Sequence, residues 1–140
     1  MTNAMENVLF EPKTSSLKFE LYHRENQQWL SNLSFIRDEI QYFETWMEHL
    51  QELNLSRTLQ NEWIALEEQF AQERVETQAL LKAIEHEEFL FGLETQQKDF
   101  QLGEEHYLKH RNLRVRFRAI EKDFHTSKHS FYEFMTDIMN

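Results

Sequence analysis

Residues 29–50 have the sequence WLSNLSFIRDEIQYFETWMEHL, in which large apolar side chains recur in steps of four and three. The recurring residues are Trp29, Leu33, Ile36, Ile40, Phe43, Met47 and Leu50. Steps of three and four place side chains on one side of an α-helix, and an unbroken series of them is typical of a helix that packs in a bundle. The stretch therefore predicts a long helix with a buried seam.

The same rhythm returns twice further along the chain. The second series contains Leu59, Trp63, Leu66, Phe70, Leu80, Ile84 and Phe91, with Glu73 and Thr77 at two of its positions. The third series contains Leu113, Phe117, Ile120, Phe124, Phe131, Phe134 and Ile138, with Ser127 as its polar exception. Each series predicts one further long helix.

We predict helices over about 16–54, 57–93 and 98–139, preceded by an N-terminal tail over 1–15. Long helices joined by two short connections must be antiparallel neighbours. The expected fold is therefore all-α, an elongated antiparallel three-helix (up-down-up) bundle with coiled-coil-like heptad packing. A single domain over 16–140 would contain it.

The chain contains two Gly, one Pro and no Cys. So few turn residues argue against a many-turned β-fold and exclude a Gly-rich phosphate loop. The lack of Cys excludes disulfides and Cys-ligated metal sites. Both glycines, Gly92 and Gly103, lie near the second turn, and each is a candidate to end the second helix.

Short hydroxyl residues lie where the predicted helices begin. Ser15 or Ser16 is expected to cap the first helix, and Ser56 or Thr58 the second, because such side chains accept hydrogen bonds from the free amides of a first turn. Thr95 could cap a third helix that starts early.

The formal net charge of the chain is -10, which opposes binding to nucleic acid or to an anionic membrane surface. A basic stretch at 109–118 is expected to pack beside the acidic stretch at 59–105 in the same molecule. No apolar run could span a bilayer, and residues 1–14 do not resemble a secretory signal. These features predict a cytoplasmic protein.

Aromatic residues make up 14% of the chain, more than a simple coiled coil requires. Most are expected in a thick core, but Phe89, Phe91, Leu93 and Phe100 are candidates for an exposed interface. No catalytic nucleophile is recognisable, so we expect a non-catalytic protein. Its expected function is protein–protein interaction or self-assembly, as a homo-oligomer or with a protein partner.

Polar residues at seam positions suggest a metal site as an alternative function. With short turns, Asn26, Glu87, His106 and His110 would form one polar layer near an end of the bundle, with His23 close by. Helical bundles hold metals by His and Glu side chains that project inward from facing helices. His106, His110, Glu87 and His23 are therefore candidate ligands for Zn, Fe or Mn.

A further alternative comes from the segment His106-Tyr-Leu-Lys109. Histidine phosphotransfer domains often show His-x-Leu-Lys followed by Gly, whereas His110 follows here. The seam also places His106 inward, although a phosphoacceptor must be exposed. The match is not taken as membership of that family, and we find no other family motif in the chain.

Overall fold

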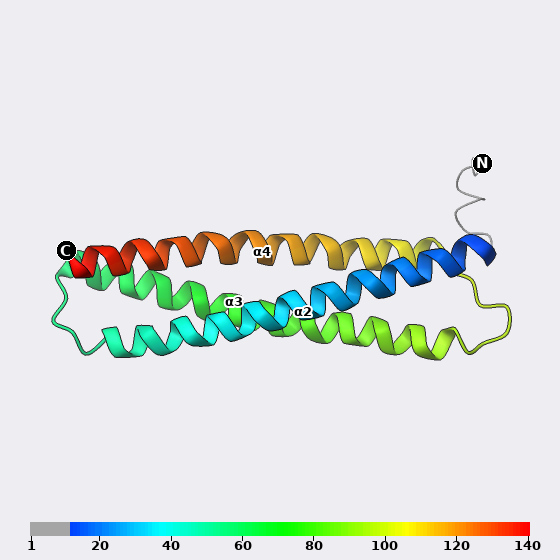
Figure 1. The fold of residues 1–140 in the computed structure, drawn as a ribbon, viewed down its shortest axis with the longest axis horizontal. Coiled ribbons are helices and arrows are strands. Elements are labelled where there is room, and N and C mark those ends of the chain that lie inside the picture. Colours follow the sequence, from blue (N-terminus) through cyan, green and yellow to red (C-terminus); the bar gives the residue numbers. More distant parts are fainter. Residues whose placement is uncertain (1–11) are drawn as a thin grey trace. The chain divides into compact units, whose positions relative to one another are not determined.

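The computed structural model describes residues 12–140, with side chains from residue 16 onward, and this part of the chain is all-α. It contains three long helices, α2 (Pro12–Leu50), α3 (Arg57–Glu94) and α4 (Glu104–Met139) (Figure 1). The three-helix, up-down-up prediction is confirmed. Of the predicted tail, residues 1–11 lie outside the described part.

The chain divides into two compact units. Unit 1 contains Met1–Asn32 and Leu80–Phe117, and unit 2 contains Leu33–Ala79 and Arg118–Asn140. Each unit therefore includes a segment of all three helices, and each has a core of its own.

Side-chain contacts within unit 1 give the direction of its helices. Phe19 of α2 contacts Phe91 of α3, and Asn26, further along α2, bonds to Glu87, earlier in α3. These two helices are therefore antiparallel. The contacts of α2 with α4 rise together in sequence, because Tyr22 stacks on His110 and Trp29 on Phe117, so these two helices run parallel.

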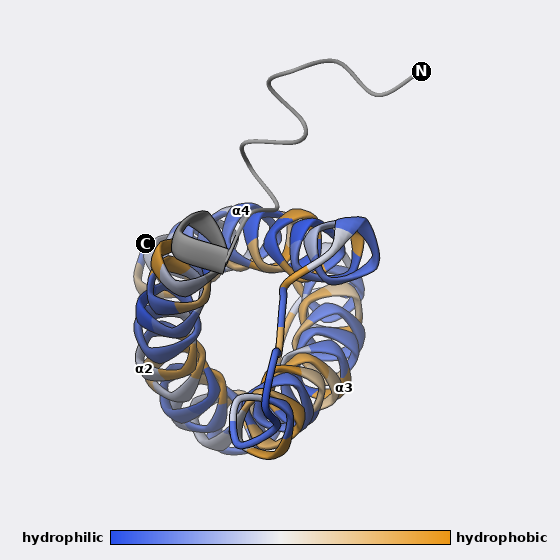
Figure 2. Ribbon diagram, turned by 90° about the vertical axis from the view of Figure 1, so that its right-hand side faces the viewer, coloured by the Kyte–Doolittle hydropathy of each residue, from blue (hydrophilic) through white to orange (hydrophobic). Residues whose placement is uncertain are grey.

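Unit 2 has the same arrangement. The ring of Phe43 stacks on that of Phe70, and the indole of Trp63 donates to the carbonyl of Met47 at 2.8 Å, so α2 and α3 are antiparallel. Its buried core consists of Ile36, Ile40, Phe43, Met47, Leu50, Leu66, Phe70, Phe124, Phe131 and Phe134. These are the predicted seam residues, and Figure 2 shows apolar positions recurring between hydrophilic ones along each helix.

The core of unit 1 includes part of the connection between α3 and α4. Leu102 is buried with Tyr22 and Phe91, and Phe100 packs against them. Residues before Gly103 therefore serve as a packed loop and not as helix, so the predicted start of the third helix at about 98 is wrong. Asp99 has a left-handed backbone conformation in this loop, with φ of 68°.

The glycines are not helix caps at the end of α3. Gly92 lies inside α3, and Gly103 directly precedes α4. Neither has a positive φ. Both predicted roles are wrong, because the reversal is made by the nine residues after Glu94 and not by a single left-handed residue.

Two predictions concern the other helix ends. The first helix begins at Pro12, so Ser15 and Ser16 are not its caps; Pro suits the first position because it has no N–H to leave unpaired. That helix ends at Leu50, earlier than predicted, and Ser56 accepts a hydrogen bond from the Leu59 amide at 3.3 Å. The predicted cap at Ser56 is confirmed.

No helix among the described residues is long and apolar enough to cross a membrane.

Candidate functional site

His110 is the centre of a buried polar cluster in unit 1. His110 is fully buried, and on α4 it occupies the inward-facing position one turn before Leu113. Two aromatic rings of α2 enclose the imidazole. The ring centroid of Tyr22 lies 4.0 Å away and that of Trp29 4.9 Å away, both nearly parallel to it. Such rings attract a cationic imidazolium through their negative faces.

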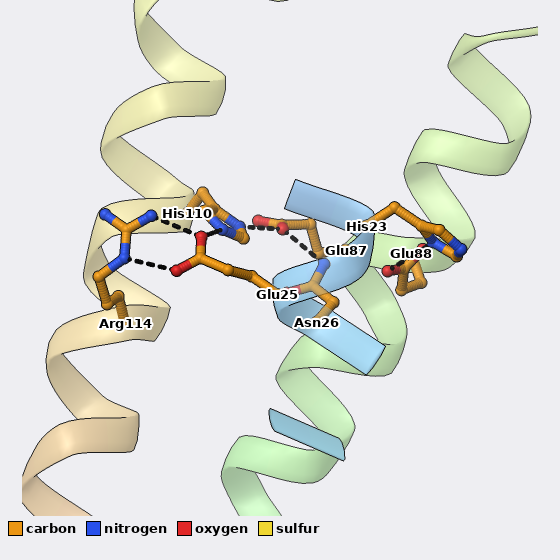
Figure 3. Close-up of polar contacts among 7 residues, drawn as sticks. All are labelled: His23, Glu25, Asn26, Glu87, Glu88, His110 and Arg114. Atoms are coloured by element: carbon orange, nitrogen blue, oxygen red, sulfur yellow. Dashed lines mark hydrogen bonds and ion pairs between the residues drawn. The ribbon is translucent and has the colours of Figure 1, made fainter. Parts of the chain in front are cut away.

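Each ring nitrogen of His110 contacts a carboxylate (Figure 3). Nδ1 lies 2.6 Å from Oε1 of Glu87, and Nε2 lies 2.8 Å from Oε1 of Glu25. An ionised carboxylate only accepts hydrogen bonds, so two ionised partners require N–H on both nitrogens. The geometry therefore fits His110 in its imidazolium form between two carboxylates.

Arg114 and Asn26 complete the cluster. Arg114 binds Glu25 through two hydrogen bonds, of 3.0 and 2.6 Å, and the amide of Asn26 donates to Oε1 of Glu87 at 3.0 Å. Burial favours a higher pKa for Glu25, but hydrogen bonds from Arg114 and His110 hold that pKa below its usual value. The same bond to Glu25 raises the pKa of Arg114. Two carboxylates thus face two cations, and the cluster is electrically balanced.

The four predicted metal ligands do not converge. Glu87 and His110 are brought together, but His23 contacts Glu88 at 2.9 Å and His106 contacts Glu94 at 2.7 Å. Each histidine thus has a carboxylate partner of its own. The described residues contain no group of three or more His, Asp or Glu that could hold a metal ion.

His106 is oriented by the start of α4. The amide of Gly103 donates to Nδ1 of His106 at 3.1 Å, so Nδ1 is an acceptor and the proton of the neutral ring is on Nε2, which donates to Glu94. This resembles a capping box, in which a side chain three residues into a helix bonds back to the residue before it. Neither nitrogen is free to accept a phosphoryl group, so the geometry does not favour phosphotransfer.

A cavity of about 570 Å³ lies between α3 and α4 in unit 1. Its lining combines apolar residues with the carboxylates of Glu87, Glu94 and Glu105. Glu94 is bonded to His106, and Glu105 is paired with Lys109 at 3.0 Å. The cavity therefore adjoins the buried cluster through Glu87, which belongs to both.

A second candidate is an exposed surface in unit 2, which we call the aromatic surface and define as Phe35, Tyr42, Trp46 and Tyr132. The three α2 members lie at steps of seven and four, the spacing of a coiled-coil seam. Glu39 falls on the same side of α2 and pairs with Lys128 of α4 at 2.9 Å. The surface therefore extends along the side of α2 that faces α4.

Tyr132 connects the α4 part of this surface to α2. Its ring lies 6.0 Å from that of Phe43, edge to face. All four residues of the aromatic surface are at least 40% exposed. Single exposed apolar residues are ordinary, whereas aromatic residues gathered on one face are characteristic of interfaces.

Of the four residues predicted from the sequence to form an exposed interface, two are exposed and two are not. Phe89 and Leu93 are exposed as expected, but Phe91 is buried and Phe100 is packed against the core of unit 1. The aromatic surface was missed, although the spacing of Phe35, Tyr42 and Trp46 could have revealed it.

Comparison with protein-family models, with curated proteins and with solved structures finds no match to this chain. Its function therefore has to be inferred from its own side chains. The feature that carries such an inference furthest is the aromatic surface of unit 2.

Proposed function

We propose that the protein is a non-catalytic helical module that self-associates through the aromatic surface. The observation that carries this proposal is the heptad spacing of Phe35, Tyr42 and Trp46 on the outside of α2, all of them 40% exposed or more. A seam of this kind is complementary to another helix. Burying Tyr and Trp at an interface core contributes more to binding than most other side chains do.

The charges on the aromatic surface favour a second copy of the chain as the partner. A two-fold interface brings the same patch of both subunits together, so the patch must be complementary to itself. Glu39 and Lys128 place one charge of each sign on the surface. A second copy can therefore present Lys128 to Glu39 and Glu39 to Lys128, whereas a patch of one sign would repel its own copy.

A non-catalytic role is supported by the surroundings of Ser127, the one hydroxyl among the described side chains that donates to a carboxylate. Ser127 donates to Oε1 of Glu73, the kind of pair that can activate a nucleophile. Both residues are buried, with Ser127 fully inaccessible. A substrate cannot reach this hydroxyl without unfolding the core of unit 2.

The proposal is tested by light scattering coupled to gel filtration over a range of protein concentrations. The wild-type chain should be a dimer, and the triple variant Phe35→Ser, Tyr42→Ser, Trp46→Gln should be a monomer with unchanged helical circular dichroism. Val75→Ser is the matched control, because Val75 is an equally exposed apolar residue of unit 2 outside the aromatic surface. It should leave the dimer intact.

A charge exchange provides a second test of the same surface. Lys128→Glu alone should weaken the dimer, because Glu39 then meets a carboxylate, and adding Glu39→Lys should restore it. A wild-type chain that stays monomeric at every concentration would overturn self-association. A control variant that dissociates as readily as the triple variant would overturn the assignment to this surface.

A further inference from the structure

Two histidines, His125 and His129, lie together on the exposed side of α4 in unit 2, and we call them the histidine pair. They are four residues apart, so their Cβ atoms lie about 6 Å apart on one side of the helix. Both residues are exposed, and the side chain of His129 is 75% exposed. An ion in solution can therefore reach both imidazole rings without any change in the fold.

The chain has a second pair of histidines at this spacing, and its ring nitrogens are already occupied. His110 is buried with a carboxylate on each nitrogen, and both nitrogens of His106 take part in hydrogen bonds. His125, by contrast, has no hydrogen-bond or ion-pair partner among the described residues, and His129 has only Glu133. The histidine pair therefore keeps nitrogen lone pairs that face solvent.

Glu133 determines which nitrogen of His129 is protonated in the neutral ring. Its Oε1 lies 3.1 Å from Nε2 of His129. An ionised carboxylate only accepts hydrogen bonds, so Nε2 carries the proton and Nδ1 keeps its lone pair. Histidines that bind metals in proteins have this arrangement, in which the other ring N–H donates to a carboxylate and makes the ligating nitrogen more basic.

Carboxylates flank the histidine pair on both sides along α4. Glu121 lies one turn before the pair and Glu133 one turn after it, so the four side chains follow one another in steps of four. Two lysines lie on the same stretch. Lys128 is paired with a carboxylate of α2 at 2.9 Å, and Lys122 is exposed, where solvent screens its charge. These surroundings favour the binding of a cation.

We propose that the histidine pair binds a divalent ion of the later first-row transition metals, with one nitrogen from each imidazole on the metal and water in the remaining positions. Metal–nitrogen bonds of about 2.0–2.1 Å place the two nitrogens about 3 Å apart, which rings on adjacent turns can reach. Two histidines four residues apart on a helix bind zinc in one class of metalloproteases. The site differs from the predicted one, because its two ligands are exposed and lie outside the His110 cluster.

The chemistry of imidazole ranks the ions that the pair should take. Cu²⁺, Ni²⁺ and Zn²⁺ all suit imidazole, and Cu²⁺ should bind most tightly of the three. Mg²⁺ prefers oxygen ligands and should not bind measurably. If Mg²⁺ binds as tightly as Ni²⁺, the carboxylates alone attract the ion and the proposal is wrong.

Isothermal titration calorimetry with Ni²⁺, on protein first treated with a chelator, tests the ligands. His125→Ala and His129→Ala should each weaken Ni²⁺ binding at least about 100-fold, because the second imidazole then no longer binds intramolecularly. His86→Ala is the matched control and should leave the affinity unchanged, since His86 is exposed on α3 and has no His, Asp or Glu three or four residues away. A control that weakens binding as much as His125→Ala would show that Ni²⁺ binds exposed histidines in general.

Urea unfolding provides a second measurement. Ni²⁺ should raise the midpoint of the wild type, because only the folded helix holds both imidazoles in place, and it should leave the midpoint of His125→Ala unchanged. Glu133→Gln should weaken Ni²⁺ binding about tenfold, as expected for a residue that orients a ligand, without changing stability in metal-free buffer. A wild-type chain that shows neither heat of binding nor a shifted midpoint with Ni²⁺ would overturn the site.

Discussion

The two units each bury polar residues at seam positions, but they treat them differently. In unit 1, the charges of Glu25, Glu87, His110 and Arg114 are all paired. In unit 2, Oε1 of Glu73 accepts a hydrogen bond from Ser127, while its Oε2 and the hydroxyl of Thr77 have no hydrogen-bond partner.

The difference arises from the residues beside the seam. In unit 1 the flanking residue Arg114 faces Glu25 and so brings a cation to the buried carboxylates. In unit 2 the cationic residues next in sequence to Ser127 and Glu73 pair with other carboxylates: Lys128 with Glu39, and Arg74 with Glu44. A buried ionisable group is therefore stabilised or strained according to its flanking neighbours and not according to its own seam position.

The largest expected effect is that of His110→Ala in unit 1. The variant leaves Glu25 and Glu87 facing one another without the imidazole and opens a void between Tyr22 and Trp29. Removing one partner of a buried charge cluster costs about 3–5 kcal/mol. Urea unfolding followed by circular dichroism measures the loss. His125→Ala, at an exposed site of α4, should change the free energy of unfolding little, and a similar small change for His110→Ala would show that the cluster is not stabilising.

Glu73→Gln should cause the next largest change in the free energy of unfolding. This change should be stabilising, and it should depend on pH. Burial, with further contributions from Asp123 and Glu76, raises the pKa of Glu73 to about 7, against a hydrogen bond from Ser127 that lowers it. The folded protein therefore retains this proton where the unfolded chain loses it, so stability falls as pH rises from about 4.5 to about 7. The shift corresponds to roughly 3 kcal/mol.

The glutamine variant removes this dependence. It should match the wild type at pH below the ordinary Glu pKa and be more stable than the wild type above pH 7. Glu68→Gln, at an exposed position of the same helix, serves as the control and should leave the pH profile unchanged. A profile for Glu73→Gln that still falls over this pH interval would mean that another group is responsible.

Arg114→Met tests the flanking contribution in unit 1 and should cost about 1–2 kcal/mol, because Glu25 and Arg114 are only partly buried and solvent screens them. The low pKa of Glu25 gives stability above its ordinary pKa that is lost as pH falls, and the variant should lose that part. Arg114→Lys keeps the positive charge but cannot make both hydrogen bonds to Glu25. Its stability should lie between those of the wild type and Arg114→Met. Equal acid sensitivity of all three proteins would contradict this role.

Part of the His110 cluster of unit 1 could be predicted from the sequence. The other part could not, because its position depends on how the helices are arranged around one another. Asn26, Glu87 and His110 were predicted to meet because each continues an apolar seam. Glu25 and Arg114 flank the seam, and whether a flanking side chain faces α3 or α4 depends on the direction in which the bundle turns, which the apolar pattern does not specify.

The predicted partners that did not join the cluster have a similar explanation. His23 flanks the seam on the side of α3 and contacts Glu88 there. His106 lies in the first turn of α4, because Leu102 is buried in the connecting loop and delays the start of that helix. The length of the loop was not readable from its two glycines, since neither makes the turn.

The smallest expected change in the free energy of unfolding is also the most direct test of the difference between the two units. Thr77→Val replaces an unpartnered buried hydroxyl of unit 2 by a methyl group of similar size, and should leave the protein unchanged or more stable by up to about 1 kcal/mol. Asn26→Leu in unit 1 also makes a seam position apolar, but it deprives Glu87 of a donor and should destabilise. Urea unfolding of both variants tests whether polar seam residues are interchangeable between the units. If both substitutions stabilise, hydrogen bonding in unit 1 gives no advantage over apolar packing, and the contrast between the units does not hold.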